Sequence, residues 1–248
     1  MEHIYAVKSQ DELAKYQEFA ASIQKRLNDY IAFLEKEYQV RDLPRSILWT
    51  NPDIATRLIS SIPLPAYTNE FRIVMSPDLE TWRAIYLHQL DSLKKSEAYE
   101  KLYHYYTKEF SLNHVMQILG HELAHHSALF GDDDGYYDRV WFEEGMVEYI
   151  SRRYFLTEDE YQAEFHVNQM LVESLKETYG GHPLSEFGAK TYEEDYASIL
   201  FEYWRSFLAV HQIIQNHDGD VKAVFETYHR WMAEGNGQSL SEWFGLPL

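Results

Sequence analysis

The pentapeptide His121-Glu122-Leu123-Ala124-His125 is the feature that most constrains the fold of this chain. On an α-helix, a step of four residues turns the side-chain direction by about 40°, so His121 and His125 leave the same face one turn apart. Two imidazoles placed in this way can bind one metal ion, whereas Glu122, about 100° further round, lies beside the ion. The chain is therefore expected to place a helix here and to bring a third ligand to that face.

Glu144 is the candidate for the third ligand. It follows His125 after eighteen intervening residues, in the segment 141–145 with the sequence WFEEG, and the chain has no cysteine that could bind a metal instead. Two imidazoles and one carboxylate leave a fourth position open for water, which is typical of catalytic zinc sites. We predict that His121, His125 and Glu144 bind one Zn²⁺ per chain and that Glu122 is the general base.

The residues around the pentapeptide predict the helix that this site requires. Ser111 is a good N-cap residue, and apolar side chains recur at helical spacing from Leu112 to Leu129. His114 and His126 lie on the same segment. They are expected to be surface-exposed or to lie beside the ligands, without binding the metal themselves.

The charge balance bears on the partners of the protein. The net charge is −18, from 22 Lys and Arg against 40 Asp and Glu, so the surface repels phosphate backbones and nucleic acid is not an expected partner. No apolar run is long enough to cross a bilayer, and residues 1–10 lack the basic and apolar regions of a signal peptide. We therefore expect no membrane association and a cytoplasmic location.

Capping and periodicity patterns predict a mainly helical α+β protein. Ser9 and Glu12 form a capping box ahead of a long amphipathic helix that ends before Pro44. Residues 47–50 and 71–75 are typical of short strands, and together they predict a small sheet on the N-terminal side. Further helices are predicted over residues 78–109 with a break near Ser96, over residues 138–156, from Thr157 to Gly180, over residues 193–217 and 220–234, and from Ser239.

No linker or repeat argues for separable domains, so one domain is predicted over residues 1–248. Residues 1–110 supply the N-terminal helix, the sheet and further helices. Residues 111–156 supply the zinc-site helices, and residues 157–248 form a helical C-terminal subdomain.

The pentapeptide and the segment 141–145 together resemble the gluzincin metallopeptidases, in particular the branch similar to aminopeptidase N. In that branch a Trp-hydrophobic-Asn-Glu-Gly segment supplies the third zinc ligand at this spacing, and here Glu143 stands where Asn is usual. The resemblance implies a zincin-like fold, His121, His125 and Glu144 as ligands and Glu122 as the base. Its specific part covers residues 121–149.

Two departures from that family leave the type of peptidase open. The Gly-x-Met-x-Asn motif, which helps those aminopeptidases to hold the free amine of the substrate, is missing upstream of His121. The chain is also too short for the further domains of that branch. Endopeptidase and aminopeptidase action on a peptide or protein substrate therefore both remain open.

Two more residues are candidates for the chemistry. The resemblance implies Tyr196, expected to open a downstream helix, as the donor to the oxyanion, with Tyr192 as the nearest rival. Glu148 follows Glu144 by four residues and so lies on the same helical face. It is placed to accept a hydrogen bond from a ligating histidine, or else to face solvent.

Two other functions fit parts of the same pattern. Glu122 and His125 also form a Glu-x-x-His unit that Glu226 and His229 repeat, and a carboxylate-bridged di-iron bundle would add Glu144 and Glu202. A zincin-like fold could also bind a partner without turning it over. Metal analysis separates the first alternative from a zinc peptidase, and hydrolysis of a peptide library separates the second.

Overall fold

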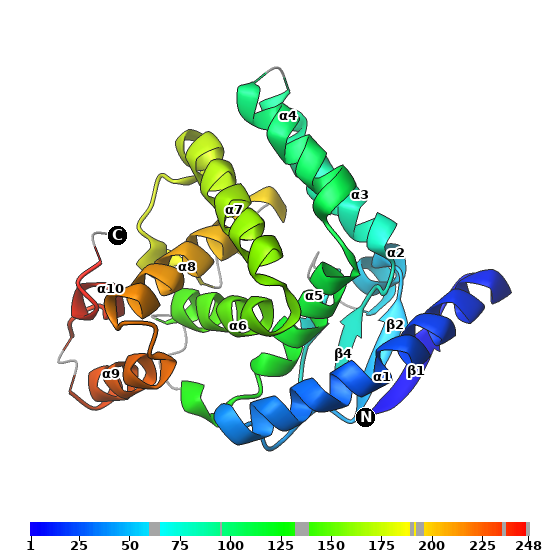
Figure 1. The fold of residues 1–248 in the computed structure, drawn as a ribbon, viewed down its shortest axis with the longest axis horizontal. Coiled ribbons are helices and arrows are strands. Elements are labelled where there is room, and N and C mark those ends of the chain that lie inside the picture. Colours follow the sequence, from blue (N-terminus) through cyan, green and yellow to red (C-terminus); the bar gives the residue numbers. More distant parts are fainter. Residues whose placement is uncertain are drawn as a thin grey trace. The chain divides into compact units, whose positions relative to one another are not determined.

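The structure is a computed structural model in which residues 1–59, 65–94, 96–131, 139–188, 191, 196–234 and 237–246 are described. It is predominantly helical with one small four-stranded sheet, as predicted (Figure 1). Its contacts divide the chain into two compact units. Unit 1 comprises Met1–Ala128 with Ile150–Tyr161, and unit 2 comprises Leu129–Tyr149 with Gln162–Leu248. A single folding domain over residues 1–248 stays a prediction.

Both units contain several helices. Those of unit 1 are α1 (Gln10–Glu37), α2 (Pro52–Ile54), α3 (Leu79–Gln89), α4 (Glu97–His104) and α5 (Leu112–Ala124), with π-helical or 3-10 segments at Ala55–Ile59, Leu90–Leu93 and Tyr105–Glu109. Two helices contribute residues to both units, α6 (Val140–Phe155) and α7 (Glu158–Tyr179). Those of unit 2 are α8 (Tyr196–Asn216), α9 (Val221–Glu234) and α10 (Leu240–Trp243), with a 3-10 segment at Leu184–Glu186. Another 3-10 segment covers Ala128–Phe130, where the first segment of unit 1 ends and that of unit 2 begins.

The sheet in unit 1 has the strand order β1-β2-β4-β3. Strands β1 (Glu2–Ala6), β2 (Ser46–Thr50) and β4 (Arg72–Met75) are parallel, and the two-residue strand β3 (Tyr67–Thr68) is antiparallel to β4. The two predicted strands are confirmed as β2 and β4. Sequence patterns missed β1 and β3, which lie at the two edges of the sheet.

Both faces of the central strands are covered, which explains why every residue of β2 is buried. Leu48 and Val74 are paired in the register and pack on one face against Ala55. Trp49 points to the other face, where its ring meets the ring of Phe19 on α1 edge-on at 5.6 Å between centroids. Because successive side chains of a strand point to opposite faces, residues of β2 pack on both faces of the sheet.

Helix α1 forms as its sequence predicts. The Ser9 hydroxyl accepts a hydrogen bond from the Glu12 backbone N–H at 3.1 Å, while the Glu12 carboxylate accepts the Lys8 N–H instead of that of Ser9. The buried side chains recur every three or four residues and so form one stripe. They are Tyr16, Ala20, Ile23, Leu27, Tyr30 and Leu34.

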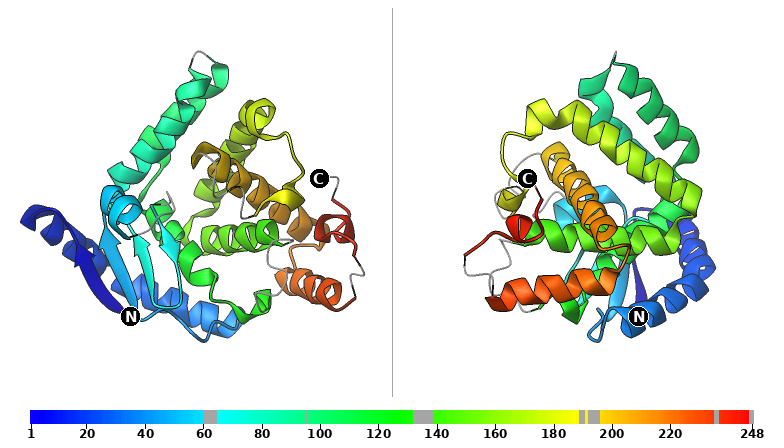
Figure 2. Two further views of the ribbon diagram at one scale, coloured as in Figure 1. Left: turned by 180° about the vertical axis from the view of Figure 1, so that it is seen from behind. Right: turned by 60° about the vertical axis from the view of Figure 1, so that its left-hand side comes forward.

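Helices α3 and α4 form a pair that extends away from the sheet (Figure 2). The Asp78 carboxylate caps α3 by accepting the Glu80 N–H at 3.2 Å, and the Ser96 hydroxyl caps α4 by accepting the Tyr99 N–H at 3.1 Å. The predicted break near Ser96 is therefore confirmed, because a new N-cap begins a new helix there. Within the described ranges, no helix has both the length and the apolar character needed to span a membrane.

In unit 2, helices α6 and α8 approach each other closely at Gly145. A Cβ atom at this position would lie 2.3 Å from the backbone oxygen of Ser206, so only glycine fits. The following helix, α9, is held by Tyr228, whose hydroxyl donates to the Phe130 carbonyl at 2.8 Å and accepts from Arg139. The helix predicted from Ser239 is confirmed as α10, and a capping box of Ser239 and Glu242 opens it.

Candidate metal centre

Helix α5 carries the pentapeptide, and its first turn is capped by a histidine. The His114 Nδ1 atom accepts the Ser111 backbone N–H at 3.0 Å, and its Nε2 atom lies 2.8 Å from the Tyr105 hydroxyl. Because Nδ1 is the acceptor, the neutral ring carries its proton on Nε2. His114 is 1% exposed, so of its two expected positions the surface one is wrong, and its ring caps the start of α5.

The Glu160 carboxylate ties the start of α5 to the start of α7. One oxygen accepts the Ser111 hydroxyl at 2.9 Å, and the other accepts the Asn113 amide and the Thr157 backbone N–H, both at 2.9 Å. Partial burial raises the pKa of Glu160, but the hydrogen bonds from Thr157, Asn113 and Ser111 outweigh it and lower that pKa below its usual range. The ionised carboxylate therefore stabilises the folded state.

Replacing Glu160 by Gln should lower the free energy of unfolding by about 1 kcal/mol at pH 7. Because the folded-state pKa is depressed, this stabilisation is present above about pH 4.5, the unfolded value, and is lost as the pH falls through the folded-state pKa. Urea unfolding at pH 7 and below pH 4 measures the difference between the two proteins. Glu158→Gln, which removes an exposed ion pair with Arg153, is the control. A difference for Glu160→Gln that does not shrink in acid would contradict this account.

The middle of α5 packs closely against α1 and α6 through Gly120. A Cβ atom there would lie 2.5 Å from the Phe155 ring and 3.1 Å from the Tyr30 ring. The Tyr30 hydroxyl, which is buried, donates to the Gly120 carbonyl at 3.0 Å. This contact fixes the turn of α5 that leads directly into His121.

Helix α5 ends at Ala124, five residues before the predicted end at Leu129. Ser127 forms an isolated antiparallel bridge with Val40, and its hydroxyl donates to the Tyr38 carbonyl. These partners come from the end of α1, a distant part of the sequence, so local periodicity could not reveal them. The helix therefore stops with His125 as its C-cap.

His126 lies just beyond the end of α5 and contacts the sheet. Its Nε2 atom lies 2.7 Å from the Thr68 hydroxyl on β3. Burial, with the neighbouring His125 ring adding to it, lowers the pKa of His126 to about 4, so the ring is neutral at pH 7. His126 is partly buried and does not belong to the group formed by the predicted ligands His121, His125 and Glu144.

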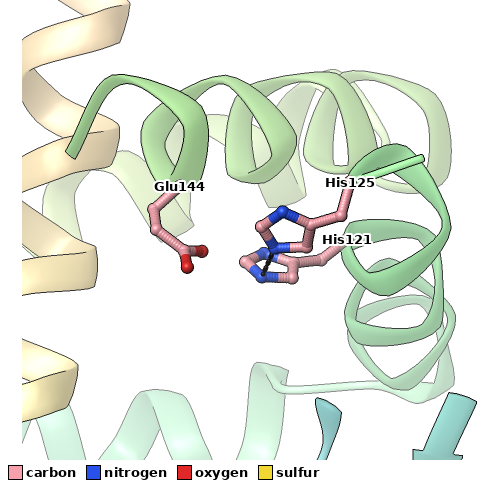
Figure 3. A group of neighbouring side chains, drawn as sticks. All are labelled: His121, His125 and Glu144. Carbon is pink, nitrogen blue, oxygen red and sulfur yellow. Dashed lines mark hydrogen bonds between the residues drawn. The ribbon is translucent and has the colours of Figure 1, made fainter. Parts of the chain in front are cut away.

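His121, His125 and Glu144 come together as predicted. Each offers one ligand atom, and these atoms all lie within 4.8 Å of one another. Figure 3 shows the two imidazoles leaving α5 side by side, with the Glu144 carboxylate reaching toward them from α6. In the described part of the chain, this is the one group of three or more His, Asp or Glu residues arranged in this way.

The spacing of the imidazoles fits a metal ion. The Nε2 atoms of His121 and His125 lie 3.2 Å apart. Two nitrogens bound at about 2.0–2.1 Å to a tetrahedral zinc ion are separated by about 3.3 Å. Two imidazole nitrogens and one carboxylate oxygen are also a donor set that zinc accepts. The residues present therefore fit the ion that the sequence predicts.

The other predicted site residues have known places in the fold. Glu122 is buried on α5, with 6% of its surface exposed, and Glu148 is partly buried on α6 one turn after Glu144. Tyr196 is partly buried and lies on α8 (Tyr196–Asn216), while residues 193–195 of the helix predicted over residues 193–217 lie outside the described residues. Tyr192 lies outside the described residues. The roles of Glu122, Glu148 and Tyr196 stay predictions.

Sequence patterns did not single out a hydrogen bond that joins α5 to α6. The Gln117 amide donates to the Ser151 hydroxyl at 3.1 Å, and both residues are buried. The signal was present, because Gln117 precedes His121 by four residues and Ser151 follows Glu144 by seven. Each therefore shares a helical face with a predicted ligand.

Two residues that the di-iron alternative requires are engaged elsewhere. His229 donates through Nε2 to the Leu129 carbonyl at 2.8 Å. Glu202 is fully buried and accepts from the Arg205 guanidinium at 3.0 Å, with His182 at 3.3 Å. Neither residue belongs to the group formed by His121, His125 and Glu144.

Comparison of the chain with models of protein families, with curated proteins and with solved structures gives no match.

Proposed function

We propose that this protein is a zinc-dependent metallopeptidase that hydrolyses peptide bonds. The observation that carries the proposal is the convergence of His121, His125 and Glu144, with the two imidazole Nε2 atoms 3.2 Å apart. Two imidazoles and one carboxylate leave a coordination position for water, which a structural site with four protein ligands does not. The resemblance of residues 121–149 to gluzincins supports the same reaction and a zincin-like fold.

Zinc is the metal that this donor set favours. The chain contains no cysteine, and the ligands are two nitrogens and one oxygen. A di-iron site would need two metals bridged by carboxylates, and two of its required residues, Glu202 and His229, are held by other partners. We therefore propose one Zn²⁺ per chain.

The proposed reaction divides its tasks between the ion and the protein. Zinc, when bound, supplies the Lewis acidity that lowers the pKa of water from about 15.7 toward about 7. Glu122 accepts the proton of the attacking water and returns it to the departing amine. Its burial on α5, one residue after His121, removes it from bulk water and so favours proton transfer within the site.

Tyr196 is the proposed donor to the carbonyl oxygen as negative charge develops there. Replacing Tyr196 by Phe removes the hydroxyl alone and should lower kcat by about 10²–10³, with little change in KM. Steady-state kinetics on a cleavable peptide measure both values. The control is Tyr99→Phe on α4, which removes the hydroxyl of another partly buried tyrosine, one whose ring stacks on that of Tyr103. An unchanged kcat for Tyr196→Phe would assign the role of oxyanion donor to another residue, and Tyr192 would be the next candidate.

Profiling the cleavage products of a mixed peptide library, with and without a chelator, tests the proposed function. We expect zinc-loaded protein to cleave, and chelated protein to cleave only after zinc is restored. The positions of the cleaved bonds separate endopeptidase from aminopeptidase action. Zinc-loaded protein that cleaves nothing would contradict the proposal and favour a protein that only binds its partner, and two irons per chain would favour the di-iron alternative.

A further inference from the structure

We propose that Gln117 and Ser151 are positioning residues, whose hydrogen bond sets the register of α5 against α6 and thereby the affinity of the metal centre. The inference rests on the proposed function, because it concerns the same three ligands. The contact is direct and buried: the Gln117 amide donates to the Ser151 hydroxyl at 3.1 Å, and these residues are 5% and 0% exposed.

Helical geometry connects this hydrogen bond to the ligands. On α5, Gln117, His121 and His125 follow at intervals of four residues and so form one row. On α6, Ser151 follows Glu144 by seven residues, two turns further along the same face. The hydrogen bond and the metal centre therefore lie along one line of contact between the two helices.

The relative direction of α5 and α6 also links the Gln117–Ser151 hydrogen bond to the position of Glu144. Gln117, which precedes His121 on α5, contacts Ser151, which follows Glu144 on α6. The two helices therefore run antiparallel along this line. Because α6 is one continuous helix from Val140 to Phe155, a shift at Ser151 moves Glu144 by the same amount along the helix axis. A hydrogen bond at Ser151 thus restricts the sliding of Glu144 past His121.

Close packing on the neighbouring face sets how near the two helices approach each other. The ring of Phe155, one turn after Ser151, lies 2.5 Å from the place that a Cβ atom of Gly120 would take, and Tyr30 packs on Phe155 with 4.6 Å between ring centroids. Apolar contacts of this kind set the distance between helices but have little directional preference. A buried hydrogen bond has a strong directional preference, so it is suited to select one register of α5 against α6.

The test compares metal affinity between variants that lose equal amounts of stability. Ser151→Ala removes the acceptor, and Thr50→Ala is the matched control, because Thr50 is also fully buried and donates its hydroxyl to the Ala6 carbonyl at 2.8 Å in the sheet. Ser151→Thr keeps the hydroxyl and is the rescue variant. Competition with a chromophoric chelator measures Zn²⁺ affinity, and urea unfolding of the metal-free proteins measures stability.

We expect Ser151→Ala to weaken Zn²⁺ binding by about 10- to 100-fold, the range found when residues that orient metal ligands are replaced. Thr50→Ala should bind Zn²⁺ as tightly as the wild type at a similar loss of stability, and Ser151→Thr should recover affinity. Visible absorption of Co²⁺-loaded protein gives a second measurement, because a change in the Co²⁺ spectrum reports altered ligand geometry and not reduced stability.

A double-mutant cycle isolates the hydrogen bond itself. Gln117→Ala should weaken Zn²⁺ binding to a similar degree, and the double variant Gln117→Ala, Ser151→Ala should bind no more weakly than either single variant. Equal Zn²⁺ affinity in wild type and Ser151→Ala would overturn the inference and leave the proposed function standing. A wild-type protein that binds no Zn²⁺ would overturn both.

Discussion

Replacing Glu122 by Gln should abolish almost all peptide hydrolysis while zinc remains bound. Glutamine has the size of glutamate but cannot accept the proton of the attacking water, so we expect kcat to fall by about two to four orders of magnitude. That fall corresponds to about 3–5 kcal/mol in the activation free energy. Zinc content should stay at one per chain, because Glu122 does not belong to the group of three ligands. Steady-state kinetics together with metal analysis of the same sample measure both quantities.

Glu164→Gln is the matched control for this variant. Glu164 is also a buried carboxylate, 7% exposed, but it lies on α7 and accepts the amide of Asn168 at 3.1 Å. Its replacement should leave kcat within a factor of a few of the wild type. A Glu122→Gln protein that cleaves peptides at the wild-type rate would show that another group takes the proton.

Replacing Gly145 by Leu should have the largest effect on folding. The backbone oxygen of Ser206 lies 2.3 Å from the position of a Cβ atom at Gly145, and the Val210 side chain lies 2.6 Å away. Backbone cannot rotate aside as a flexible side chain can, so α6 and α8 must separate. We expect a loss of about 3 kcal/mol in the free energy of unfolding, at the upper end of the range for overpacked interiors. Urea unfolding followed by circular dichroism measures it.

Gly181 provides the control for this substitution. It lies in the turn after α7, and a Cβ atom there would meet nothing within 4 Å. Gly181→Leu should change the free energy of unfolding by less than about 0.5 kcal/mol. If Gly145→Leu proved equally harmless, the close approach of α6 and α8 would be wrong. Since Gly145 follows Glu144 directly, the same substitution should also weaken Zn²⁺ binding.

The helices could be predicted from the sequence because their signals are local. Ser9, Ser96 and Ser239 each accept a backbone N–H from the first turn of the helix that they begin, as their positions ahead of apolar periodic segments indicate. The pairing of the proposed ligands His121 and His125 was predictable for the same reason. A spacing of four residues places His121 and His125 on one face whatever the rest of the chain does, and the WFEEG segment indicates the second helix.

Features that depend on distant partners could not be predicted in this way. Strand β1 lies at an edge of the sheet and has no buried residue, and β3 has only two residues. Helix α5 was predicted to continue to Leu129, but the bridge between Ser127 and Val40 ends it earlier. The buried capping role of His114 depends on Tyr105, outside the helix that it begins. In each case tertiary contacts outweigh local propensity.

X-ray absorption at the zinc edge, on purified protein loaded with one equivalent of Zn²⁺, tests the central claim most directly. We predict a four-coordinate ion with two imidazole nitrogens at about 2.0–2.1 Å and oxygen ligands at about 2.0–2.2 Å. The imidazole signal should fall by half in His125→Ala. A zinc shell made of oxygen alone, or a shell that is the same in wild type and His125→Ala, would contradict the assignment of His121, His125 and Glu144 as the metal ligands.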